Sequence, residues 1–258
     1  MAKRGFQGAV LKVLGARDYS ATVTGSELLA PNFLRVTFES DTLLDSIDNG
    51  PTAWVRLWIP DADGRDIEYQ RGYTISTSDP ETGTFSIDFV LHEPAGPASE
   101  WASEAVPGTT ISLTSLGSTK FEAPETNPAG YLIIGDSAAI PAINSILEVV
   151  PHEVPIELYL EEHDPADREI PLAVHPHLTT HWVPRTDAQS LAAGIESRDW
   201  SGWKVWAAPE SGSLKHLRRL LRDIFGFTKT DIVAQAYWIE HRSMGKERIR
   251  DSDPSHVT

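Results

Sequence analysis

The sequence changes character around residues 122–130, and this change constrains the fold more than any other feature. Before this segment the chain consists of short runs of β-branched and aromatic residues between turns; after it, continuous apolar strands alternate with helical stretches. The segment itself, Glu-Ala-Pro-Glu-Thr-Asn-Pro-Ala-Gly, has two prolines and no apolar periodicity, as expected of a linker between two cores. We therefore expect two domains, residues 1–125 and 126–241, followed by a polar tail over residues 242–258.

The N-terminal part is expected to form an antiparallel β-barrel. Turns such as Asp61-Ala62-Asp63-Gly64 and Pro107-Gly108 separate its short strands at spacings that suit antiparallel pairing. One helix is expected over residues 97–105, because proline is favoured in a first turn and Pro107-Gly108 stops the helix. The predicted strands cover residues 20–28, 33–39, 53–59, 69–76, 84–91 and 109–116.

The C-terminal part is expected to form a parallel, doubly wound sheet. Its predicted strands are continuously apolar, as in strands buried on both faces, and helices are expected up to residue 150 and over residues 214–225. The predicted strands cover residues 131–134, 156–160, 180–183, 204–207 and 232–238.

Composition narrows the functional classes. The 37 acidic against 22 basic residues give a formal net charge of −15, which disfavours binding to nucleic acid or to an anionic lipid surface. No apolar run is long enough for a membrane span, and the basic start lacks the apolar block of a secretion signal, so we expect a soluble cytoplasmic protein. The chain has no cysteine, so redox chemistry would need a bound organic cofactor or a His/carboxylate metal site.

Three motifs are candidates for ligand binding. Arg71-Gly72-Tyr73-Thr74 ends a predicted strand, where alternation puts Arg71 and Tyr73 on one face and Thr74 on the other. A cation and an aromatic ring could then line one side of an anionic aromatic ligand. The alternative is an ordinary edge strand with a packed tyrosine and a solvated arginine.

The second motif, His92 through Ala102, is a strand that runs through a Gly/Pro loop into a helix. Free backbone N–H groups, the helix dipole and the Ser99 hydroxyl would form a site for a pyrophosphate. The alternative is a structural corner with Ser99 as a cap and Trp101 in the core. The third motif, Leu132 through Ile143, is the first βα unit of a nucleotide-binding sheet, although it lacks the G-x-G-x-x-G fingerprint.

In this order the motifs resemble the siderophore-interacting protein family of flavin-dependent ferric-siderophore reductases, a branch of the ferredoxin-reductase-like superfamily. The resemblance extends from about Phe6 to Trp238, and it implies an N-terminal antiparallel FAD-binding β-barrel followed by a C-terminal parallel-sheet NAD(P)H-binding domain. The segments that resemble the family are Arg71-Gly72-Tyr73-Thr74, His92 through Ala102, Gly135 through Ala142, Trp206 through Glu210, Leu217-Arg218-Arg219 and Tyr237-Trp238.

The resemblance also implies roles for single residues. Tyr73 would lie against the flavin ring and Thr74 would hydrogen-bond near its reactive edge, so these two are the catalytic candidates, while Arg71 would neutralise phosphate. No metal site is expected. The other FAD candidates are His92, Gly96, Ala98 and Ser99, the last three for the pyrophosphate. Candidates for the NAD(P)H cleft are Gly135, Asp136, Ser137 and Glu210, and Tyr237-Trp238 would return to the flavin from the C-terminal side.

The implied activity is the passage of electrons from NADH or NADPH to FAD and then singly to a ferric siderophore, with release of Fe(II). Two departures, Ser76 and Ile239 where many members have arginine, reduce the basic character expected near an anionic catecholate. Residues 51–54, 71–76 and 135–144 are most similar to the branch that forms a domain of mycobacterial mycobactin importers. This favours a mycobactin- or carboxymycobactin-like substrate, with an importer at the inner membrane face as a partner.

Two other functions stay open, an NAD(P)H:flavin reductase that releases its flavin and a siderophore carrier without turnover. Three further features have alternative interpretations. The basic residues Arg218, Arg219 and Arg222 would bind a dinucleotide phosphate or form a solvated face. The other two are interpreted as loops: His175, His177 and His181 rather than a zinc site, and Glu161-Glu162-His163-Asp164 rather than an acid/base dyad.

Overall fold

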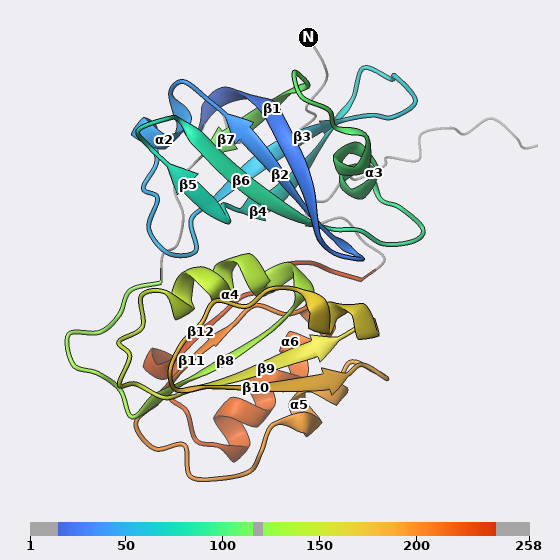
Figure 1. The fold of residues 1–258 in the computed structure, drawn as a ribbon. Helices are drawn as coiled ribbons and strands as arrows, with labels where there is room; N and C mark the ends of the chain where they lie inside the picture. The colour runs from blue at the N-terminus through green and yellow to red at the C-terminus, as the bar shows by residue number, and fades with distance from the viewer. Residues whose placement is uncertain (1–14, 116–120, 241–258) are drawn as a thin grey trace, which may run out of the picture.

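The computed structural model describes residues 15–115 and 121–240, which form two sheets that follow each other along the chain (Figure 1). The first is a seven-stranded antiparallel sheet in the order β4-β3-β7-β1-β2-β6-β5, and the second is a five-stranded parallel sheet in the order β10-β9-β8-β11-β12. The predicted fold class, an antiparallel barrel-like sheet followed by a parallel sheet, is confirmed. The predicted tail over residues 242–258 lies outside the described residues.

The long strand β1 (Arg17–Ala30) pairs with both β2 and β7 and so forms the middle of the first sheet. The helix predicted over residues 97–105 is present as α3. The remaining elements of this part are β2 (Phe33–Glu39), α2 (Leu43–Ser46), β3 (Trp54–Pro60), β4 (Glu68–Thr74), β5 (Thr77–Asp79), β6 (Thr84–Val90), α3 (Pro97–Glu104) and β7 (Thr110–Ser115).

The strand predicted over residues 69–76 is wrong at its end, because the chain changes pairing partner after Thr74. Ile75 N still donates to Ala53 O beside β3, but Ser76 N donates to Ser86 O on β6. The following residues continue as the short strand β5 along β6. The motif Arg71-Gly72-Tyr73-Thr74 therefore ends at the point where the chain crosses from one edge of the open barrel to the other.

The second sheet is covered by helices on both faces, as predicted. Residues of α4 pack on one face of the sheet, which is the face toward the first sheet, and α5 and α6 pack on the other (Figure 1). In residues 15–115 and 121–240, no helix is both long enough and apolar enough to cross a bilayer. The strands are β8 (Gly130–Asp136), β9 (Ile156–Glu162), β10 (Leu178–Pro184), β11 (Trp203–Ala207) and β12 (Ile232–Ala234). The helical elements are η1 (Ser137–Ala139), α4 (Ile140–Leu147), η2 (Pro165–Glu169), α5 (Ser190–Gly194), α6 (Ser211–Arg219), a π-helical turn η3 (Leu220–Ile224) and η4 (Lys229–Asp231).

The strand predicted over residues 232–238 is also too long, because β12 ends at Ala234. Its neighbour β11 ends at Ala207, and beyond that point the chain runs along a loop instead of a strand. Tyr237 and Trp238 consequently lie outside the sheet, at its carboxyl edge.

The two sheets share a buried interface built on α4. Ala30 and Phe33, at the turn between β1 and β2, belong to the same core cluster as Ile140 and Ile143 of α4. A hydrogen bond from Thr52 N to Ser145 Oγ (3.0 Å) also links the first part of the chain to α4. This interface fixes the position of β4 relative to the parallel sheet.

Gly135 allows the end of β8 to approach the helix that follows it, and a side chain there should be destabilising. A Cβ atom at Gly135 would lie 2.8 Å from Ala139 Cβ and 3.1 Å from Ile143 Cδ1. Because both neighbours are fully buried, Gly135→Ala should lower the free energy of unfolding by about 1–3 kcal/mol, measured by urea denaturation. Gly25→Ala is the control, since a Cβ there meets nothing within 4 Å. Equal midpoints for the two variants would contradict the prediction.

Candidate functional site

The motif strand β4 has the two-faced arrangement that the sequence predicts. Arg71 and Tyr73 lie opposite the core residues Leu57 and Val55 of β3, on the inner side of the sheet, and Thr74 belongs to the other side. Tyr73 packs against Phe89 of β6 with 4.5 Å between ring centroids, and its burial raises the pKa of the phenol. Tyr73 thus packs against the core of the first sheet while its side chain stays partly exposed, where a ligand could contact it.

Arg71 is the cation of this motif, and no carboxylate among the described residues matches its charge. Its Nη1 donates to Gln70 O (2.8 Å), but it forms no ion pair in the described part of the chain. Six other Lys and Arg side chains of the described residues have a carboxylate partner; examples are Arg35 with Asp88 and Arg168 with Glu162. The guanidinium is therefore available to an anion.

The second motif forms a helix N-terminus without a side-chain cap. Gly96 is the N-cap residue of α3, and in the described part of the chain no side chain caps the helix. Ser99 does not cap the helix; its buried Oγ accepts a long hydrogen bond from His92 N (3.4 Å). Trp101 packs against Phe38 and Phe89, as in the alternative interpretation. The segment is therefore both a packed corner and an open anion site, since its first N–H groups keep no side-chain partner.

These features fit a bound FAD. The contacts from Tyr73 to Phe89 and from Phe89 to Trp101 put the motif strand and α3 on the same core cluster. Ser76 Oγ, two residues beyond Thr74, is buried with no hydrogen-bond partner. A ligand with a pyrophosphate and a hydrogen-bonding ring would satisfy the unpaired cation, the free N–H groups and the orphaned hydroxyl.

The candidates in the second domain gather at the carboxyl edge of the parallel sheet, but Asp136 turns toward the protein. It is 1% exposed and accepts three hydrogen bonds from the chain itself. The donors are Ala138 N to Oδ1 (3.0 Å), Glu210 N to Oδ2 (3.0 Å) and Trp238 Nε1 to Oδ2 (2.8 Å). Gly135 and Ser137, on either side of Asp136, are also buried.

Glu210 is likewise occupied by the protein. It is the N-cap of α6, where its Oε2 accepts from Gly212 N and Ser213 N, and its Oε1 accepts from Glu240 N (3.1 Å). Burial alone would raise the pKa of Glu210, but these backbone bonds and one from the Ser211 hydroxyl outweigh it and the pKa is lowered. The Glu210 carboxylate stays ionised because backbone N–H groups and the Ser211 hydroxyl donate hydrogen bonds to it.

The loop interpretation of residues 161–164 is wrong for Glu161 and Glu162, which belong to strand β9, whereas His163 and Asp164 lie exposed beyond the strand end. Strand β9 continues to Glu162, so Glu161 lies inside the sheet and is fully buried. It accepts hydrogen bonds from Ser213 Oγ (2.9 Å) and Arg185 Nη1 (2.8 Å), with His163 Nε2 at 3.2 Å. The available signal was their position, since polar residues directly after an apolar parallel strand fall at the sheet's carboxyl edge.

Four carboxylates and two basic side chains thus form a charge cluster at this edge. Burial raises the pKa of Asp136 to about 6. Burial also acts to lower the pKa of His163, but Glu161 and Asp136 outweigh it and the pKa is raised. The members of the cluster are Asp136, Glu161, Glu210, Glu240, Arg185 and His163.

Asp136, Glu161 and His163 bring potential metal-ligand atoms within 4.8 Å of one another. Glu161 already bonds the Arg185 guanidinium, so the positive charge at this place is supplied by the protein. The three histidines that were considered as a zinc site, His175, His177 and His181, do not point to one common centre. His175 bonds Pro151 O (3.3 Å), whereas His181 bonds Glu157 (2.6 Å) and stacks on Tyr159.

Tyr237 lies beside the loop that follows β11, where its backbone N donates to Pro209 O (3.2 Å). Its ring lies edge-on to Trp206, and burial raises the pKa of its hydroxyl to about 12. Trp238, the next residue, bonds Asp136 instead. The structure therefore places the C-terminal aromatic pair at the carboxyl edge of the parallel sheet, and its approach to the flavin stays a prediction.

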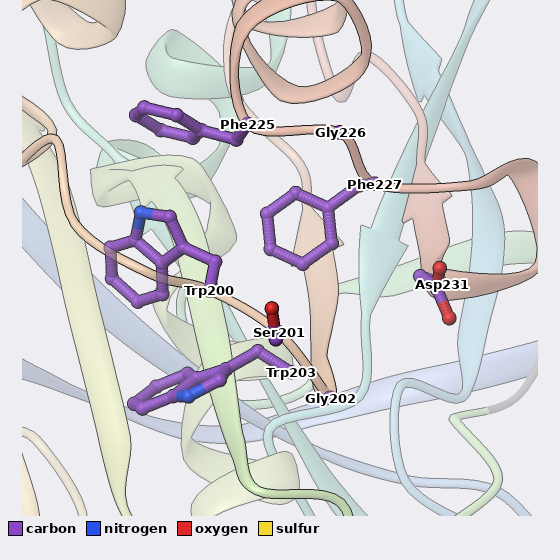
Figure 2. A pocket seen from close by; sticks show the side chains of 8 residues that line it. All are labelled: Trp200, Ser201, Gly202, Trp203, Phe225, Gly226, Phe227 and Asp231. Carbon is purple, nitrogen blue, oxygen red and sulfur yellow. The ribbon is translucent and has the colours of Figure 1, made fainter.

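A separate pocket of about 110 Å³ lies at the amino edge of the parallel sheet, away from these residues (Figure 2). Aromatic rings of Trp200, Phe225 and Phe227 surround it, and Asp231 lies at its margin. Asp231 is paired with Lys204 at 2.7 Å, which with Thr228 lowers its pKa to about 2. The pocket offers no unpaired charge and lies apart from the candidate site.

The pKa shifts at the carboxyl edge predict that the protein is more stable at pH 5 than at pH 8. The raised pKa of His163 contributes stability below its ordinary value of 6.5, which is lost as pH rises through the folded pKa. Asp136 acts in the same direction, because its folded pKa of about 6 exceeds the ordinary 3.8 and the folded state holds the proton more tightly. Carboxylates with lowered pKa values, such as Asp61 at about 2, oppose this only at lower pH.

Urea unfolding at the two pH values measures this effect. His163→Gln should reduce the difference between them, whereas His177→Gln, at an exposed position, should not. Equal stability of the unmodified protein at pH 5 and pH 8 would contradict the prediction.

Two family profiles match the chain. The Siderophore-interacting FAD-binding domain matches residues 66–118, and the Siderophore-interacting protein profile matches residues 128–241. Together they cover more than half of the chain, and each falls on one of the two sheets.

Individual relatives agree with the profiles. The chain is 58% identical over 255 residues to the mycobactin import ATP-binding/permease protein IrtA of Mycolicibacterium thermoresistibile, a match that covers 98% of this chain but 28% of that protein. It is 26% identical over 254 residues to the ferric vibriobactin reductase ViuB of Vibrio cholerae, covering 89% of this chain and 90% of the relative. The structure of a siderophore-interacting protein from Acinetobacter baumannii has the same fold, with a TM-score of 0.76 and 24% identity over 88% of this chain and 93% of that chain. The chain spans less than a third of the importer's length and belongs to the siderophore-interacting protein family.

Proposed function

We propose that the chain is a ferric-siderophore reductase, in which electrons pass from NADH or NADPH to FAD and on to Fe(III) held by a siderophore. The observation that best supports this is the packing of Tyr73 on Phe89 and of Phe89 on Trp101, which puts the motif strand and the uncapped helix α3 on one core cluster. A relative of similar length, the ferric vibriobactin reductase, points to the same chemistry.

FAD would supply the redox chemistry, because a flavin accepts two electrons as hydride and passes them on singly, as reduction of Fe(III) requires. The protein's task is to bind and orient it. Arg71 would neutralise phosphate charge, and the N–H groups of Ala98 and Ser99 would donate to the pyrophosphate, with Gly96 and His92 alongside. Tyr73 would cover one face of the ring.

Thr74 would donate a hydrogen bond near the reactive edge of the flavin. It is 7% exposed and lies at the junction of the two sheets, where water is largely excluded. The donor NAD(P)H would enter at the carboxyl edge of the parallel sheet, where Gly135 and Ser137 provide a close backbone approach and Asp136 and Glu210 shape the edge. Residues 1–125 would then be the FAD-binding domain and residues 126–241 the NAD(P)H-binding domain.

The substrate proposed is a mycobactin- or carboxymycobactin-like siderophore, reduced in the cytoplasm next to an importer at the inner membrane face. Support comes from the mycobactin importers, to which the chain is 58% identical over 255 residues in one case. The net charge of −15 and the presence of Ser76 and Ile239 instead of arginines also favour a less anionic ligand than a catecholate.

Absorption spectroscopy tests the proposed activity. The purified chain with equimolar FAD should show a bound flavin that bleaches with anaerobic NADH or NADPH and recovers when a ferric siderophore is added, while a ferrous chelator reports Fe(II). Turnover of free flavin without retention would instead indicate a flavin reductase. Absence of flavin binding would leave the siderophore carrier.

Substitution of the motif strand tests the binding site. Arg71→Ala and Tyr73→Ala should each raise the dissociation constant for FAD by about tenfold or more, because the first removes a charge-assisted contact and the second removes aromatic cover. Flavin fluorescence titration measures this. Lys215→Ala, an exposed cation on α6, is the matched control and should leave the constant unchanged. Equal affinities in all three variants would remove Arg71 and Tyr73 from the site.

A further inference from the structure

The turn before β3 holds a threonine in a backbone conformation that favours glycine. Ala53 N donates to Gly50 O (3.1 Å), so residues 50–53 form a β-turn with Pro51 and Thr52 at its centre. Thr52 has a φ of 62°. Proline followed by a residue of positive φ is the pattern of a type II turn, where glycine or asparagine normally takes the second central position. A β-branched residue there is strained, and such strain persists only where the surrounding structure holds it.

The contacts of Thr52 account for this strain, because they join it to two segments of the second domain. Thr52 is 4% exposed, and its backbone N donates to Ser145 Oγ of α4 (3.0 Å). Its own Oγ1 accepts from Phe121 N (3.1 Å), on the segment that leads to β8. The Ser145 hydroxyl is oriented in turn, since it donates to Ala142 O within α4 (2.7 Å). A glycine would adopt the turn without strain but could not accept from Phe121.

The same turn is bonded to the end of the motif strand. Ala53 O accepts from Ile75 N (2.9 Å), the residue that follows Thr74. Strand β3 begins directly after Ala53 and pairs with β4 up to the last residue of β4. Two hydrogen bonds and two consecutive residues, Thr52 and Ala53, therefore connect Ser145 of α4 to the end of the flavin motif.

This connection restrains a motion that the apolar interface leaves open. Phe33 of the first sheet shares a core cluster with Ile140 and Ile143, which lie in the first half of α4. Apolar burial is non-directional, so it holds the two sheets together without fixing the angle between them. The bond to Ser145, further along the same helix, is directional and adds a second point of attachment. Two points on one helix set the rotation of the first sheet relative to the second.

We propose that Thr52 is a positioning residue for hydride transfer: by bonding to α4, it fixes the end of β4 relative to the parallel sheet. This rests on the proposed function, in which FAD lies on β4 and NAD(P)H at the carboxyl edge of that sheet. Hydride transfer oxidises the nicotinamide and reduces the flavin by two electrons. The reacting atoms must approach to about 3–3.5 Å, and a misplacement of about 1 Å costs about a hundredfold in rate. Thr52 thus acts through the geometry of the two domains.

Hydrogen exchange of the ligand-free protein tests the mechanical part of this proposal. Ser145→Ala keeps a good helix former on α4 but removes the acceptor of the Thr52 N–H, so amides 52 and 75 should exchange about tenfold faster. Ser201→Ala, which removes a hydroxyl bonded to Asp199 (2.6 Å) at the amino edge of the parallel sheet, is the matched control and should change neither amide. Unchanged exchange at amide 75 in Ser145→Ala would overturn the link from α4 to β4.

Single-turnover reduction of bound FAD by NADH or NADPH tests the role in the reaction. Thr52→Gly, which accepts the positive φ, and Ser145→Ala should keep the dissociation constant for FAD within about twofold, yet slow reduction at saturating donor about tenfold. Thr52→Ser, which keeps the hydroxyl, should restore most of the rate. Thr52→Ser as slow as Thr52→Gly, or a loss of rate that more donor or more FAD abolishes, would overturn the proposal.

A double-mutant cycle tests whether the two residues act as one link. Thr52→Gly in the Ser145→Ala background should slow reduction little further, because the connection to α4 is already broken. Independent, multiplying losses of rate in the double variant would overturn the proposal.

The two levels of inference fail differently. If the unmodified protein binds no FAD, the proposed function fails and the role of Thr52 in hydride transfer fails with it, although the exchange data still report the link to α4. If FAD binds and Fe(II) is produced but Thr52→Gly and Ser145→Ala are reduced as fast as the unmodified protein, only the positioning role is overturned.

Discussion

The ion pair between Glu161 and Arg185 is the interaction on which the carboxyl edge of the parallel sheet depends. Glu161 is fully buried and Arg185 Nη1 lies 2.8 Å from its Oε2. Removing one partner of such a pair leaves an uncompensated buried charge, at a cost of about 3–5 kcal/mol. The Arg185 guanidinium also pairs with Glu240, the last described residue, and the Glu161 carboxylate also accepts a hydrogen bond from Ser213 on α6. The contacts of Glu161 and Arg185 therefore join β9, the residue after β10, helix α6 and the last described segment of the chain.

The fold could be predicted because its signals are local. Alternating β-branched and aromatic residues mark the strands of the first sheet, and unbroken apolar runs mark those of the second. The anion-binding helix end after His92 follows from the Gly-Pro order alone. The strand ends at Thr74 and Ala234 could not be predicted, because they depend on which neighbour the chain pairs with next. A change of partner leaves no local mark.

The charge cluster escaped prediction for a similar reason. Glu161 is a polar residue that would be solvated in isolation; its burial depends on Arg185, which follows a later strand. Asp136 and Glu210 were correctly expected at the carboxyl edge of the parallel sheet. The direction in which their carboxylates face depends on hydrogen bonds from Trp238 and Glu240, which are distant in sequence. The packing of Tyr237 against the core cluster of α4 likewise joins residues that are distant in sequence.

The uncapped first turn of α3 has a consequence for the protein without its ligand. A helix of eight residues with no side chain on its free N–H groups has little stability of its own and depends on packing by Ala98, Ser99 and Ala102. An anion bound there supplies the missing acceptors, so the ligand and the helix stabilise each other. Occupancy of the site should then govern how readily proteases cut the loop from His92 to Gly96, which makes degradation of the protein sensitive to the supply of its cofactor.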